Sequence, residues 1–244
     1  MNVEQSVRIA VAFAREAAKS PAASLCAACV DVLGVTGAGI TVMGGGQAGP
    51  LCVSNKRMAA LEDSQYTLGE GPCQDAYHAG LPVHAPHLDK MAPDRWPSFV
   101  GVARDAGIGA AFAYPLTTNG ARVGVLTLYQ NDEGELSAAQ NDDSIALSEV
   151  LTEMVLSLQD EAPAGVLAPG LEQAVTYRAE IHQAAGMVAI QLQIPVAEAL
   201  LRIRAHAFST SRPVGAVAAD IVGRRLRLVD DHSEPHGPQS EEGV

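Results

Sequence analysis

The sequence is poor in positive charge, in aromatic residues and in long apolar runs. Its 244 residues include 16 basic and 28 acidic side chains, and only 4% of them are aromatic. The resulting net charge of −12 excludes non-specific binding of nucleic acids or membranes by the surface as a whole. No apolar run approaches the roughly 20 residues of a membrane span, and charged residues interrupt the helix-like stretch 3–20. We therefore expect a cytoplasmic protein with no signal peptide and no membrane partner.

Cysteine is also scarce, and four cysteines in a chain of this length do not indicate a disulfide scaffold. Cys26 and Cys29 form a C-x-x-C pair, but the second such pair that would indicate a structural zinc site is missing. We therefore expect no metal site, and we expect Cys26 and Cys29 to be small buried residues, with redox sensing or metal binding as the alternatives. Cys73 lies at a predicted helix start, where thiolate is favoured, and is the best candidate for a reactive thiol.

Motifs of catalysis are missing as well. The sequence contains no Gly-rich phosphate loop, no dinucleotide fingerprint and no Ser/His/Asp group with supporting residues around it. We therefore predict that the protein is not an enzyme, and the residues identify no cofactor.

The first 160 residues alternate helix and strand signals. Asn119-Gly120, between two β-rich runs, predicts a tight hairpin. Ser137 and Gln140 form a capping box that opens a long helix, and its apolar stripe of Leu147, Leu151, Met154 and Leu158 covers the sheet or contributes to a dimer. The pattern predicts an α+β domain in which helices flank an antiparallel sheet. The expected helices are 3–19, 24–33, 72–79, 96–105 and 137–159, and the expected strands are 39–43, 51–54, 81–85, 109–116 and 122–129.

A smaller domain follows a stretch that is rich in Pro and Gly. Residues 161–170 contain two prolines and two glycines, a composition typical of an interdomain linker. Periodicity then predicts an all-α bundle of three helices, at 172–191, at 196–209 and from 213 onward. The chain therefore divides into a domain at 1–160, a linker at 161–170, a domain at 171–229 and a disordered acidic tail at 230–244. The residues assigned to the bundle core are Met187, Leu200, Leu201, Ile203, Phe208 and Ile221.

The helical segment 171–229 is the only basic part of the chain. It holds seven of the 16 basic residues, all of them arginine, against four acidic residues, so its net charge is +3. A basic module attached to an acidic body indicates that the module meets a polyanion. Charge by itself leaves RNA, DNA and an acidic partner equally open.

Three runs in this segment resemble the ANTAR domain, an RNA-binding module of bacterial transcription antiterminators. They are QAAGM at 183–187, ALLRIRA at 199–205, and VAADIVGRRLR at 217–227. The resemblance implies that the module binds RNA hairpins in nascent transcripts, whose splayed loop bases side chains can read. Many ANTAR domains have lysine where Ala185 stands, so a basic contact of the family is missing here or is replaced by Arg178 or His182. The RNA-binding residues that follow are Arg178, His182, Gln183, Gly186, Arg202, Arg204, His206, Arg212, Arg224 and Arg225.

The body of the chain is similar to GAF domains of the kind that precede ANTAR in actinobacterial proteins. The matching residues are LGEGPC at 68–73, RWP at 95–97, and the run from Pro115 to Tyr129. The resemblance implies a sensor domain with a small-molecule pocket beside its sheet, and it names no ligand. It also leaves open a redox cue received by Cys73, Cys26 or Cys29.

The leading hypothesis is therefore a dimeric regulator in which a GAF sensor controls an RNA-binding ANTAR bundle. Dimerisation is expected because paired hairpins favour two linked copies of a small module. One alternative is a thiol enzyme that resembles the free methionine-sulfoxide reductases and pairs Cys73 with Cys26, Cys29 or Cys52. The other is a DNA-binding bundle, although the connection at 209–213 does not have the form of a tight helix-turn-helix turn.

Overall fold

The computed structural model describes residues 7–14, 25–44, 47–160, 169–210 and 212–229, and side chains at 44, 47–48, 158–160 and 169–178 are outside this description. The centre of the fold is a five-stranded antiparallel sheet with the strand order β2-β1-β5-β4-β3. The strands are β1 (Gly37–Gly44), β2 (Gln47–Val53), β3 (Val83–Ala85), β4 (Ala110–Thr118) and β5 (Ala121–Gln130). The predicted tail and most of the predicted linker lie outside the described residues, as does most of the helix expected at 3–19, of which residues 7–14 are helical.

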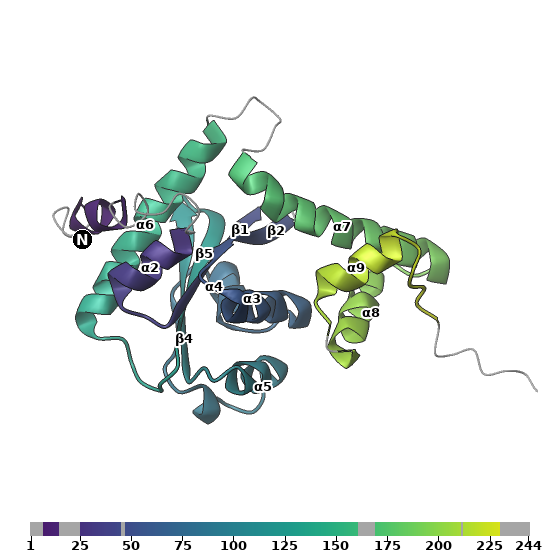
Figure 1. The fold of residues 1–244 in the computed structure, drawn as a ribbon, viewed down its shortest axis with the longest axis horizontal. Helices are drawn as coiled ribbons and strands as arrows, with labels where there is room; N and C mark the ends of the chain where they lie inside the picture. The colour runs from purple at the N-terminus through teal and green to yellow at the C-terminus, as the bar shows by residue number, and fades with distance from the viewer. Residues whose placement is uncertain (1–6, 15–24, 45–46, 161–168, 211, 230–244) are drawn as a thin grey trace, which may run out of the picture.

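Helices cover both faces of the sheet (Figure 1). One face carries α2 (Leu25–Leu33) and α6 (Ala138–Asp160), and the other carries α3 (Lys56–Leu68), α4 (Pro72–Ala79) and α5 (Pro97–Asp105). Successive side chains of β1 and β4 point to opposite faces of the sheet, and most of them are buried. Both faces of the sheet therefore need a covering layer, which the helices provide. The α+β prediction is confirmed.

The hairpin and the capping box form as the sequence predicts. Asn119 and Gly120 join β4 to β5 with φ values of 46° and 80°, as a type I′ turn requires. At the start of α6, the Gln140 amide donates to the Ser137 hydroxyl at 3.2 Å, and the Ser137 amide donates to the Gln140 side chain at 3.1 Å. Leu147 and Leu151 of the α6 stripe are buried in the core that α6 shares with the sheet, so these two cover the sheet.

Helix α3 is absent from the sequence prediction, and β2 begins earlier than predicted. Asn55 caps α3 by accepting a hydrogen bond from the Met58 amide at 3.1 Å. Helix α3 lies so close to β1 that a Cβ on Gly37 would meet the Met58 sulfur at 2.3 Å, and one on Gly39 would meet the Glu62 side chain at 2.7 Å. The sequence predicts a loop at 44–50, between the expected strands 39–43 and 51–54. This prediction was wrong for residues 47–50, which belong to β2.

The C-terminal bundle consists of α7 (Pro169–Leu192), α8 (Val196–Ser209) and α9 (Val214–Val222). Its core contains Ile181, Ala185, Val188 and Ile203, together with small residues of α8 and α9. A lysine at position 185 would place an ammonium in this core, so alanine fits the packing of this chain. The core assignment of Leu201 and Phe208 was wrong, because these side chains are 61% and 58% exposed. Alanines at 199 and 207 complete the buried face of α8 instead.

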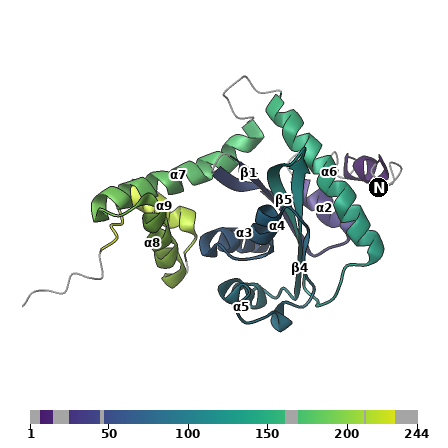
Figure 2. The same ribbon diagram turned by 180° about the vertical axis from the view of Figure 1, so that it is seen from behind.

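The bundle lies beside the outer edge of the sheet. Helix α7 packs along the edge strand β2, and α8 contacts α3, an arrangement visible from both sides (Figures 1 and 2). Among the described residues, no single helix is long and apolar enough to cross a membrane. Segments Ala179–Leu192 and Val196–Ser209 reach that composition only as a pair bent by 107°.

Candidate ligand cavity and nucleic-acid interface

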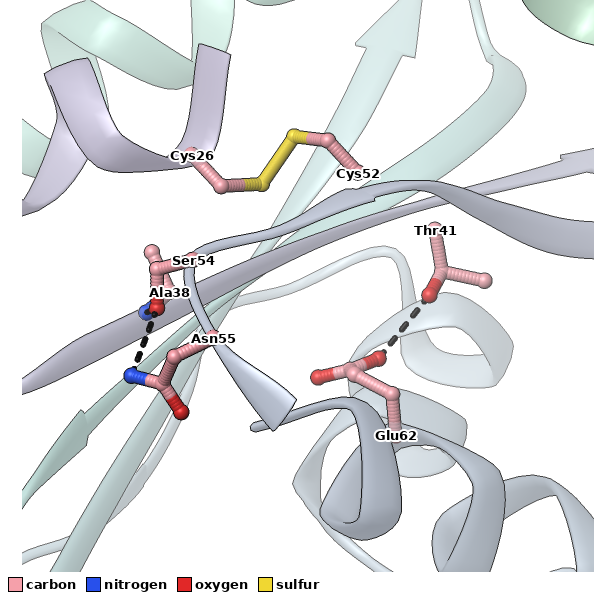
Figure 3. Close-up of a disulfide and its surroundings, with 7 residues drawn as sticks. All are labelled: Cys26, Ala38, Thr41, Cys52, Ser54, Asn55 and Glu62. Atoms are coloured by element: carbon pink, nitrogen blue, oxygen red, sulfur yellow. Dashed lines mark hydrogen bonds between the residues drawn. A yellow bond between two sulfur atoms is a disulfide. The ribbon is translucent and has the colours of Figure 1, made fainter. Parts of the chain in front are cut away.

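Cys26 and Cys52 form a disulfide that the sequence prediction did not contain (Figure 3). It joins α2 to the edge strand β2, with 5.9 Å between the two Cα atoms. The C-x-x-C spacing directed attention to Cys26 and Cys29, which share a helix, whereas the bonded partner is 26 residues away. The expectation that Cys26 is simply a small buried residue was therefore wrong, while the expectation for Cys29 holds.

Cys29 and Cys73, the cysteines outside the disulfide, are both buried. Burial raises the pKa of the Cys29 thiol to about 12, so it is protonated at neutral pH. Cys73 lies on the opposite face of the sheet from the disulfide, in a cluster with Met43 and Ala76, and its amide donates to the Gln65 side chain at 2.8 Å. The sheet therefore separates the Cys73 thiol from the Cys26–Cys52 disulfide.

A buried polar network lies between α3 and the sheet. The Glu62 carboxylate accepts hydrogen bonds from the Thr41 hydroxyl at 2.9 Å and from the Tyr129 hydroxyl at 2.7 Å, and the Thr41 bond is drawn in Figure 3. The Gln65 amide group donates to the Tyr129 hydroxyl at 2.8 Å. Burial, with the nearby Glu62 carboxylate as the second cause, raises the pKa of Tyr129 well above its ordinary value, so the hydroxyl stays protonated and acts as a donor.

A cavity of about 140 Å³ opens beside this network. Its polar lining includes Thr41, Glu62 and Asp63, and its apolar lining includes Val53 and Tyr66. A partly open cavity that combines an apolar wall with a few convergent polar groups has the lining of a small-molecule site, and its volume, below the roughly 300–1,000 Å³ of sites for drug-sized molecules, limits the ligand to a small one. Sequence reasoning missed these residues, because α3 itself was missed.

The arginines of the bundle differ in their electrostatic surroundings. Arg202 pairs with Glu198 one helical turn away at 3.0 Å. Arg212 and Arg225 both pair with Asp220, at 2.5 and 2.7 Å, and their hydrogen bonds lower the pKa of that carboxyl. These three arginines therefore have part of their charge balanced within the bundle.

Arg204 faces the N-terminal domain instead of solvent. Its guanidinium lies over the ring of Tyr66 in α3, 4.9 Å from the ring centre. Its Nε atom is buried and has no hydrogen-bond partner among the described residues. Tyr66 also lines the cavity, so one aromatic ring borders both the candidate ligand site and the helical bundle.

The remaining predicted RNA-binding residues lie along α7 and α8. His182 and Gln183 are exposed on α7, and His206 is partly exposed on α8. A Cβ on Gly186 would meet nothing within 4 Å, so no described neighbour packs closely against it. Arg178 belongs to α7, and its side chain is outside the described part of the chain.

Arg224 borders a groove between α7 and the segment that follows α9, and so does Arg227, which the sequence analysis did not select. The groove has a volume of about 550 Å³ and an apolar floor that includes Met187 and Ile190. Among the described residues neither Arg224 nor Arg227 forms an ion pair. Spacing on one helix could not reveal this site, because α7 and the chain beyond α9 meet only in the folded bundle.

Comparisons with known proteins find two domain families along the chain. The GAF domain family matches residues 22–142, and the ANTAR domain family matches residues 170–222. No protein of curated function matches the sequence.

Solved structures resemble the N-terminal part. A GAF domain of a phosphoenolpyruvate-protein phosphotransferase from Coxiella burnetii shares 13% identity at a TM-score of 0.49, over 66% of this chain and 98% of that one. A free methionine-R-sulfoxide reductase from Neisseria meningitidis, solved with its substrate, shares 14% identity at a TM-score of 0.42, over 63% and 90%. The two family matches, in this order and on these two folded units, show that the chain joins a GAF domain to an ANTAR domain, the arrangement of GAF–ANTAR regulators.

Proposed function

We propose that this protein binds hairpin RNA through its ANTAR bundle and regulates transcription antitermination in response to a signal that its GAF domain receives. The observation that carries the proposal is the pair of unbalanced arginines, Arg224 and Arg227, on the only basic module of an acidic chain. Arginine suits RNA because its planar guanidinium forks onto phosphate and stacks on bases. The cavity beside Glu62 is the proposed signal site, and its mostly apolar lining with a few polar groups supports a small ligand that carries a polar group.

The proposed functional unit is a homodimer, since a small module gains affinity for paired hairpins when two copies are linked. Gly186 and the exposed side chains of α7 and α8 support this proposal, because they form surface of the bundle that a second copy of the chain could contact. Sedimentation of the full chain with and without RNA tests the stoichiometry. A 1:1 complex with a two-hairpin RNA would contradict the dimeric unit.

The RNA activity is tested by in vitro selection with the full chain against a pool of transcripts that carry a fixed stem and a randomised loop. We expect particular loop sequences to be enriched, the affinity of these hairpins to fall with salt because arginine–phosphate contacts release counterions, and duplex DNA of equal length to compete poorly. Equal competition by duplex DNA would favour a DNA-binding bundle. Failure to enrich any RNA would contradict RNA binding itself.

A further inference from the structure

We propose that the groove between α7 and the segment after α9 is a pocket for one unstacked RNA base, with Arg224 and Arg227 holding the phosphates on either side. The proposal rests on the RNA binding proposed above and assigns the base-recognition site of that activity. The volume of about 550 Å³ lies in the range of roughly 300–1,000 Å³ that small-molecule pockets occupy.

The floor of the groove supports stacking. The partly exposed side chains of Met187 and Leu226 provide its apolar surface together with Ile190, which is 82% exposed. Ile221 also borders the groove but is buried in the bundle core, so the apolar surface open to a ligand comes mainly from Ile190 and Met187. An aromatic base laid against this surface would remove it from water, and an apolar or aromatic contact of this kind tolerates the flat face of any base.

The rim of the groove supports binding of phosphate. The carboxylate of Asp220 forms ion pairs with Arg212 and Arg225, and that of Glu198 forms one with Arg202. Within the part of the chain that the structure describes, Arg224 and Arg227 have no such carboxylate. The two exposed arginines without a carboxylate partner among the described residues therefore lie beside the apolar side chains of the groove. Positive charge next to an apolar surface fits a base with its flanking phosphates.

The wall that carries the two arginines is held in place before any ligand binds. The amides of Arg225 and Leu226 donate to the Asp220 carbonyl at 2.7 and 3.1 Å, and the Gln191 side chain donates to the Leu228 carbonyl. Arg224 adopts a left-handed backbone with φ of 57°, a conformation that a non-glycine residue rarely adopts and that turns the chain back toward α7. A preformed wall lowers the ordering cost of binding.

The test uses the full chain and a hairpin enriched by the selection described above. Each loop nucleotide is replaced in turn by an abasic residue, and dissociation constants are measured across salt concentrations for the wild type and for Ile190→Ala, Arg224→Ala and Arg227→Ala. Arg104→Ala, which removes an exposed arginine from α5, is the matched control. Circular dichroism verifies the fold of each variant, and Ile190 is exposed enough for its replacement to leave the core intact.

We expect one loop position at which the abasic change weakens wild-type binding by about 5-fold, because the apolar side chains of the groove then stay exposed to water. Ile190→Ala should weaken the intact hairpin and abolish that position's penalty while leaving the salt dependence unchanged. Arg224→Ala and Arg227→Ala should each lower the slope of log affinity against log salt by about 1, and Arg104→Ala should change nothing.

Two results overturn the pocket separately from the RNA activity. If hairpins are enriched but the groove variants keep wild-type affinity, abasic profile and salt slope, RNA binds elsewhere on the chain. If Ile190→Ala converts a dimer to a monomer in sedimentation while the abasic profile persists, the groove is an interface between copies of the chain. If no RNA is enriched at all, the proposed function fails and the pocket fails with it.

Discussion

Cys29 is a residue whose surroundings predict its chemistry directly. The thiolate is the nucleophile, and burial raises the pKa of this thiol to about 12. At pH 8 the thiolate fraction is therefore about 10⁻⁴, and little of it can meet a reagent. We expect iodoacetamide to leave Cys29 unmodified in the native protein and to modify it in guanidinium, as peptide mass spectrometry will show. Rapid native labelling of Cys29 would contradict the burial that α2 and α6 provide.

Tyr129 is the residue at the centre of the buried polar network. Its hydroxyl donates to Glu62 and accepts from Gln65, so Tyr129→Phe removes two hydrogen bonds and leaves a buried carboxylate oxygen short of a donor. We expect the free energy of unfolding in urea to fall by about 1–3 kcal/mol. Tyr114→Phe is the graded control, because Tyr114 is also buried in the sheet but its hydroxyl donates to the amide side chain of Asn141 and not to a carboxylate. An equal loss in both variants would argue against a special role for the network.

The candidate RNA-binding residues show what residue patterns can and cannot predict. The sequence identified the arginine-rich module, because net charge and residue type are properties of composition. It could not separate Arg224 from Arg225, although they are neighbours in the chain. Only the folded segment after α9 pairs one with Asp220 and turns the other toward the groove.

At the scale of elements, the Cys26–Cys52 disulfide constrains where the edge strand β2 lies. It closes a loop of 26 residues, which in the chain-entropy model corresponds to a stabilisation of about 3.5 kcal/mol. We expect dithiothreitol to lower the free energy of unfolding of the wild type by up to that amount. A Cys26→Ala/Cys52→Ala variant provides the control, since its stability should not respond to the reductant. A wild type that is equally insensitive, with both thiols free in mass spectrometry, would show that the bond does not form.

The disulfide also bears on the position of the bundle, because β2 is the strand along which α7 packs. Reduction should therefore increase hydrogen exchange in β2 and in the facing part of α7 more than in β4 and β5, which lie inside the sheet. If hydrogen exchange in β2 and α7 is the same before and after reduction, the disulfide does not hold the bundle in its position.

Elements with local signals were predicted well, and elements fixed by tertiary contacts were not. The Asn119-Gly120 turn, the Ser137 capping box and the proline-initiated α4 are each specified by a few adjacent residues. Helix α3 has no comparable apolar stripe, because its buried face includes Glu62 and Gln65, which are polar. Its place depends on Gly37 and Gly39 of a strand that lies earlier in the chain, so periodicity within α3 could not reveal it.

At the scale of the whole molecule, the bundle contacts the N-terminal domain in two places, where α7 packs along β2 and where α8 meets α3 at one aromatic ring. Arg204 of α8 covers Tyr66 of α3, and the same ring lines the cavity proposed for the signal. A cation over an aromatic face contributes about 0.5–2 kcal/mol, which changes a docking equilibrium by roughly 2- to 30-fold. The Arg204 Nε is buried without a hydrogen-bond partner among the described residues, and the loss of its hydration offsets part of the cation–π stabilisation. The net stabilisation of this contact is therefore small enough for a ligand to overcome. A ligand that moves Tyr66 would therefore shift the position of the bundle.

This arrangement predicts different effects for the two sides of the contact. Tyr66→Ala should release the bundle and leave Arg204 free, so the radius of gyration from X-ray scattering should increase and the affinity for an enriched hairpin should rise several-fold. Tyr66→Phe keeps the ring and should behave as the wild type. Arg204→Ala should release the bundle equally, but without the gain in affinity if Arg204 itself contacts RNA. If Tyr66→Ala leaves both the scattering and the RNA affinity unchanged, the contact between α3 and α8 does not restrain the bundle, and the GAF signal must act through α7 and β2.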